Sequence, residues 1–125
     1  MKSITFSRLD KNVPFPTGNP FNLICRSSCE TGIGEKMIRT GILITIPDDN
    51  FIEIRSQVAG ADLVGWHPDP ETSEMILILR GHVGVATGDV VAKVYIRDAP
   101  MSKVRFCELV NGRRTFYGDG MEIQK

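Results

Sequence analysis

The sequence predicts an all-β fold, a jelly-roll-like β-sandwich or β-barrel with little or no helix. Twelve glycines and seven prolines are spread through 125 residues, so few windows could hold three uninterrupted helical turns. Apolar residues alternate with their neighbours in short segments, as in Ile42, Ile44 and Ile46. Turn-forming residues separate these segments at the intervals typical of sandwiches and barrels.

Seven strands are predicted, each an apolar run between turn residues. They span Ile4 to Arg8, Phe21 to Cys25, Lys36 to Ile46, Phe51 to Val58, Ser73 to Leu79, Val90 to Ile96 and Val104 to Leu109. Met75 to Leu79 is apolar at every position, so both faces of this strand need cover, from a second sheet or from another subunit. Met101 to Val110 lacks Gly and Pro, which leaves a helix open as the alternative there.

Length and charge limit the organisation of the chain. With 42% hydrophobic residues, 125 residues suffice for one core, and we predict one β domain over residues 1–111. Residues 112–125 are polar and rich in turn formers, and are predicted to be a C-terminal arm. Fifteen basic residues balance fifteen acidic ones, so the broad basic face that grips nucleic acid is not expected. Neutrality also makes self-association easier.

The cysteines and the hydropathy pattern bear on location. Three cysteines are an odd number, and residues 1–10 lack the apolar run of a secretory signal. A reducing compartment, cytoplasmic or nuclear, is therefore expected, and secretion is not. No run approaches the roughly 18 apolar residues of a membrane span. No Cys-x-x-Cys spacing is present, so no metal site is predicted.

A collinear series of short motifs resembles the trimeric dUTPase family. In chain order the motifs are Gly34-Glu35, Thr40-Gly41-Ile42, Pro47, Arg55-Ser56 and Gly88-Asp89-Val90-Val91-Ala92. The resemblance covers roughly residues 21–96. It implies a jelly-roll-like domain of the dUTPase type that assembles as a homotrimer, with sites built between subunits. Small dUTPase-derived proteins without intact motifs are a viral theme, so the resemblance also points to a viral or phage type.

The resemblance implies where a nucleotide substrate would lie. The substrate-binding positions carried over are Asn22, Arg55, Ser56, Gly88, Lys93, Arg114 and Phe116. Lys93 stands where the family usually has Gln, and Gln57 replaces the Gly that follows Arg-Ser. Arg114 and Phe116 match the Arg and the aromatic ring of the family's last motif, although an aromatic side chain on an arm could equally dock on a neighbouring subunit.

Hydrolysis of a nucleoside triphosphate needs cations on the phosphates, usually Mg²⁺, and a carboxylate that activates water. Asn22 stands where the family's first motif has an acid. With Glu74 as the anchor of the third motif, Pro68 occupies the position of the general base and Glu71 that of a Tyr. Asp69, one place away, is the remaining candidate base, although the prolines on either side favour a rigid turn.

These substitutions predict a dUTPase-like homotrimer that has lost catalysis and acts by binding a host or regulatory protein, or another ligand. Two alternatives stay open. One is a divergent Mg²⁺-dependent nucleotide pyrophosphatase using Asp69, Arg55, Ser56 and Lys93, and the other is an inactive nucleotide sensor. No cofactor is expected unless the enzyme alternative holds.

Overall fold

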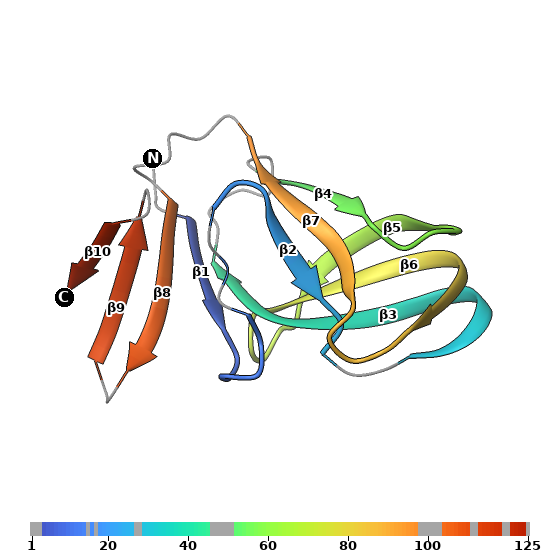
Figure 1. Ribbon diagram of the computed structural model, residues 1–125, viewed down its shortest axis with the longest axis horizontal. Helices are drawn as coiled ribbons and strands as arrows, with labels where there is room; N and C mark the ends of the chain where they lie inside the picture. Colours follow the sequence, from blue (N-terminus) through green and yellow to red (C-terminus); the bar gives the residue numbers. More distant parts are fainter. Residues whose placement is uncertain are drawn as a thin grey trace.

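Ten β-strands form two sheets in the computed structural model, which describes residues 4–14, 16, 18–26, 29–45, 52–97, 104–110, 113–118 and 121–124 and contains no helix among them (Figure 1). The strands are β1 (Ile4–Arg8), β2 (Phe21–Ile24), β3 (Cys29–Thr45), β4 (Ile52–Ser56), β5 (Ala61–Pro68), β6 (Glu74–Val85), β7 (Val90–Ile96), β8 (Val104–Val110), β9 (Arg113–Gly118) and β10 (Met121–Gln124). The all-β prediction is confirmed.

The larger sheet has the strand order β10-β9-β8-β1-β3-β6-β5, and the smaller sheet has the order β2-β7-β4. Neighbouring strands pair antiparallel except β1 and β8, which are parallel. Over the described strands neither sheet closes into a barrel, so the fold is a sandwich and not the barrel alternative. In Figure 1 β2 and β7 of the small sheet cross in front of β3 and β6, while β8 to β10 extend the large sheet away from them.

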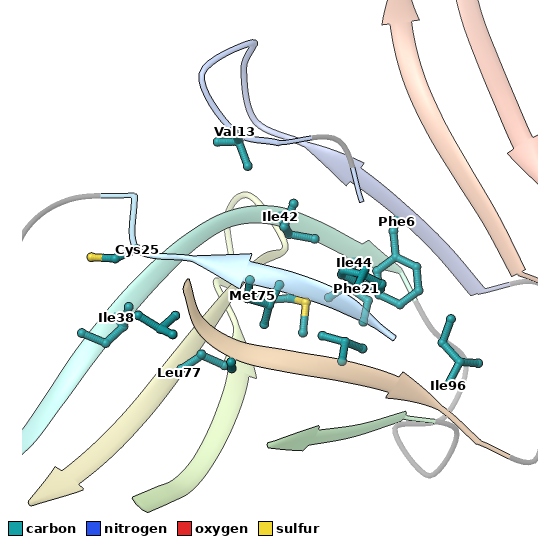
Figure 2. Close-up of a cluster of buried hydrophobic side chains, with 14 of the residues drawn as sticks. Phe6, Val13, Phe21, Cys25, Ile38, Ile42, Ile44, Met75, Leu77 and Ile96 are labelled. Carbon is teal, nitrogen blue, oxygen red and sulfur yellow. The ribbon is translucent and has the colours of Figure 1, made fainter. Parts of the chain in front are cut away.

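The core lies between the two sheets because each contributes one apolar face. Figure 2 shows Met75 and Leu77 of β6 close to β2 and β7, with Phe6, Phe21 and Ile44 gathered at one end. The Phe6 and Phe21 rings meet edge to face with their centroids 5.0 Å apart, a favourable aromatic geometry. The alternating apolar positions of the sequence therefore mark the inward faces correctly.

All seven predicted strands are present, although several boundaries move. β1 and β7 match their predicted ranges, and β8 is a strand over the described part of the segment for which a helix was the alternative. β3 begins seven residues earlier than predicted, at Cys29 instead of Lys36. Glycine is typical of turns, but Gly34 lies within β3 and faces Gly81 across the pair of strands, and both residues have positive φ.

β5 was missed because its sequence contains turn formers. Gly65 follows a β-bulge, and Pro68 ends the strand. β5 is the edge of the large sheet and pairs only with β6, so a proline that lacks an N–H is tolerated there. A turn was predicted at Pro68-Asp69-Pro70; Pro68 belongs to β5 instead, and the turn lies at residues 70–72.

The residues of the predicted arm form β9 and β10, which continue the large sheet from β8. Only the backbone of these two strands is described. The division of the chain into a domain and an arm stays a prediction.

Candidate functional site

Three of the predicted substrate-binding residues lie in one row across the small sheet. In the strand register Asn22 of β2 faces Lys93 of β7, and Lys93 faces Arg55 of β4. Their neighbours Phe21, Val94 and Ile54 face the core, so period-two alternation directs the row to the outer face. Directly opposite residues have Cβ atoms about 4.5–5.5 Å apart, so these three side chains can contact one ligand.

The row carries an excess of positive charge. Within the described part of the chain, neither the Lys93 ammonium nor the Asn22 amide has a side-chain partner. On the same face, two residues further along β7 from Lys93, Tyr95 lies opposite Glu53. Lysine supplies a compact point charge with three donors, which suits a phosphate or carboxylate group. We call this outer face, consisting of Asn22, Glu53, Arg55, Lys93, Tyr95 and Arg97, the cationic face.

Ser56 follows Arg55 but points to the opposite side of the strand. Its hydroxyl donates to Ala61 O at 3.1 Å and accepts from Val58 N at 3.3 Å. The Gln57 backbone N–H donates to Val91 O at 2.8 Å. The Ser56 hydroxyl therefore stabilises the β4–β5 connection, and the Gln57 N–H continues the pairing of β4 with β7. The Arg55-Ser56 segment here forms a strand end and turn instead of an open phosphate loop.

Gly88 lies apart from the row, in the turn before β7. Its N–H donates to Cys25 O at 2.8 Å, and its φ of +94° favours glycine. A surface cavity of about 370 Å³ lies beside it, lined by Asp10, Asn12, Val13, Ile24, Arg26 and Thr87. Gly88 thus closes a turn at the end of β2, beyond the residues that face a ligand on the row.

Asp69 caps the turn between β5 and β6. Its Oδ1 accepts from Glu71 N at 2.8 Å and Thr72 N at 3.3 Å, and its Oδ2 accepts from Arg39 at 3.1 Å. The Glu71 N–H, followed by Arg39, lowers the pKa of Asp69. A base held ionised by such donors is a weak proton acceptor, so these contacts disfavour the predicted catalytic role.

A buried ion cluster centred on Glu74 was not predicted. The Glu74 carboxylate is only 2% exposed and accepts from Arg26 Nε at 2.8 Å, Arg39 Nη1 at 2.9 Å and Gly41 N at 2.8 Å. Arg39 also pairs with Asp69, so one network joins β3, β6 and the segment after β2. The only sequence feature that points to this cluster is the position of Glu74 directly before the five apolar residues Met75 to Leu79.

The ion pairs of Asp69 and Glu74 should make the stability of the fold sensitive to acid. Burial raises the pKa of Glu74, but hydrogen bonds from Arg26, Gly41 N and Arg39 outweigh burial and lower it overall. A carboxyl whose pKa is depressed on folding stabilises the protein above its unfolded value, about 4 for Asp and Glu, and loses that contribution below it. Urea unfolding at a series of pH values should give a constant free energy from pH 7 to 5 and a decline below about pH 4. A flat profile down to pH 3 would contradict the native pairing.

The remaining predicted residues have no described side chains. Arg114 and Phe116 lie in β9, opposite Leu109 and Cys107 of β8, and their side chains fall outside the described part of the structure. Among the described residues, no group of three or more His, Cys, Asp or Glu side chains is placed to hold a metal ion. The described residues also include no helix that is long and apolar enough to cross a bilayer.

No protein-family model matches the chain, and no curated protein matches it in sequence. The function proposed for it therefore depends on its own residues.

Proposed function

We propose that this protein is a dUTPase-like homotrimer with degraded catalytic motifs that binds an anionic ligand on the cationic face without hydrolysing it. The observation that carries the proposal is the row of Asn22, Lys93 and Arg55, which three separate strands bring to one outer face. Nucleotides are the first ligands to consider, because the resemblance assigns all three positions to substrate binding. An acidic segment of a host or regulatory protein would use the same charges.

The face has the chemistry to bind phosphate, and its carboxylate, Glu53, is paired with Arg55 and Arg97. Lys93 and Arg55 supply two cations, and Asn22 supplies an amide that can donate or accept. Asn22 replaces the first acid, and Pro68 replaces the general base. The carboxylate of Asp69 is held by Arg39 and by turn amides. The hydrogen bond from Arg97 outweighs burial and lowers the pKa of Glu53, so this carboxylate is also a weak proton acceptor, and the face favours binding over turnover.

A turnover assay tests the loss of catalysis. dUTP and the other nucleoside triphosphates are incubated with the full chain, with and without Mg²⁺, and pyrophosphate is measured. We expect no release above the rate without protein. Metal-dependent release that Asp69→Ala abolishes would establish the pyrophosphatase alternative instead, whereas calorimetric binding of dUTP without release would support the proposal.

The homotrimer is supported by an apolar surface on the outer side of the large sheet. Met75, Leu77 and Leu79 face the core, so Ile76 and Ile78 face the other way. Ile76 is buried within the chain, but Ile78 is only half-buried and faces the exposed Met37 across the strand pair. The exposed Val64 lies in the β5 bulge beside Gly65, which faces Ile78. We call Met37, Val64 and Ile78 the outer apolar surface.

Met37→Glu should dissociate the trimer. Met37 is 61% exposed in the single chain, and burying a carboxylate in an apolar contact costs several kcal/mol. Light scattering at micromolar concentration should give three chains for the wild type and one for the variant. Leu9→Glu is the matched control, because Leu9 is an exposed apolar residue outside this surface. A monomeric wild type would remove the trimer from the proposal.

A further inference from the structure

Two arginines on the cationic face share one carboxylate. Glu53 Oε2 accepts from Arg55 Nη2 at 3.1 Å, from Arg55 Nε at 3.2 Å and from Arg97 Nη2 at 3.1 Å. The three residues come from two adjacent strands, since Glu53 and Arg55 lie on β4 and Arg97 directly follows β7. Because both guanidinium groups reach the same oxygen atom, they lie next to each other.

Tyr95 holds this pair of cations in place. The Arg55 guanidinium lies 4.8 Å from the centroid of the Tyr95 ring, and the Arg97 guanidinium lies 5.1 Å from it. Cations at this distance are attracted to the ring, and stacking restricts the rotamers of long side chains. Two like charges are thus kept together by an aromatic ring and by one exposed carboxylate.

We propose that Arg55 and Arg97 form a second anion subsite beside Lys93, that Glu53 fills this subsite in the ligand-free protein, and that a ligand with two linked phosphoryl groups displaces Glu53. This inference rests on the proposed binding function of the cationic face. One phosphoryl group contacts Lys93 and Asn22, while the second takes the place of the Glu53 carboxylate between the arginines. Glu53 therefore discriminates between ligands with one anionic group and ligands with two.

The weakness of the internal pairs makes the exchange feasible. Glu53, Arg55 and Arg97 are each more than two-fifths exposed, and exposed ion pairs contribute only about 0.2–1 kcal/mol each. A phosphoryl group carries more charge and more acceptor oxygens than a carboxylate, and arginine binds such groups bidentately. Arg55 belongs both to the row with Asn22 and Lys93 and to the pair with Arg97, so the two subsites are adjacent.

Glu53→Gln tests the inference, with inorganic phosphate and pyrophosphate as probes in calorimetry at constant ionic strength and without metal. The variant removes the competing charge from both arginines. Pyrophosphate should bind about 3- to 10-fold more tightly to the variant than to the wild type, the equivalent of one to two exposed pairs, whereas phosphate affinity should change less than twofold. The matched control is Glu35→Gln, because Glu35 forms a comparable exposed pair with Arg80 on the large sheet, and it should leave both affinities unchanged.

Arg97→Gln in the Glu53→Gln background separates a subsite from a general charge effect. A subsite requires Arg97, so the double variant should lose the gain for pyrophosphate. If the gain persists without Arg97, or if phosphate and pyrophosphate gain equally, the second subsite is contradicted while anion binding by the face stands. If neither probe binds the wild type or Glu53→Gln, the subsite and the proposed function both fall.

Discussion

Glu74→Gln is expected to lower the free energy of unfolding by about 2–4 kcal/mol, slightly less than the roughly 3–5 kcal/mol for breaking a fully buried ion pair. The amide nitrogen would face at least one of the present donors, Arg26, Arg39 or the Gly41 N–H. Arg26 and Arg39 are each about one-third or more exposed and can recover water, which keeps the loss below the largest recorded values. Urea unfolding with a common m-value measures the change.

Glu35→Gln is the control for this variant also. It removes the same charge from a pair that is exposed on both sides, and should change stability by less than about 1 kcal/mol. Equal effects from the two variants would mean that the Glu74 cluster is not buried as described.

Lys93→Ala is expected to weaken binding of dUTP, or of inorganic phosphate, by about 10- to 100-fold, which corresponds to one charge-assisted hydrogen bond. Lys93 is the central residue of the row, with Asn22 on one side and Arg55 on the other. Its side chain has no described partner to be left unsatisfied, so stability should stay the same. Calorimetry measures affinity, and thermal unfolding verifies that the variant is folded.

Lys36→Ala provides the comparison for Lys93→Ala. Lys36 is also a half-buried lysine within a strand, but it lies on β3 in the large sheet. If both variants weaken binding equally, the ligand senses overall charge instead of the row.

The sequence predicted best those strands that show a clear local alternation of apolar and polar residues. From Ala92 to Ile96 this strand alternates between buried and half-buried positions, and the observed bounds of Val90 to Ile96 match the prediction. β5 and the first part of β3 were missed because Gly34, Gly65 and Pro68 read as turn residues. Both segments form strands because they pair with β6. The pairing of strands that are distant in sequence cannot be predicted from the local residue pattern.

The candidate site was predictable only in part. Motif order identified Asn22, Arg55 and Lys93, which the strand register aligns. The same motifs suggested Ser56 and Gly88, whose hydrogen bonds stabilise turns. Glu53, Tyr95 and Arg97 belong to no motif of the resemblance, and only the alignment of β4 with β7 brings them together. The Glu74 cluster joins residues 26, 39, 41 and 74, a set that no sequence spacing reveals.

A titration of the isotope-labelled full chain with dUMP, followed through backbone amide chemical shifts, tests the central claim most directly. If the outer side of the three-stranded sheet holds the phosphate, the largest shifts belong to Asn22, Arg55 and Lys93. Shifts concentrated at Asp69 to Thr72, or around Gly88 and Arg26, would locate the ligand elsewhere and contradict the account.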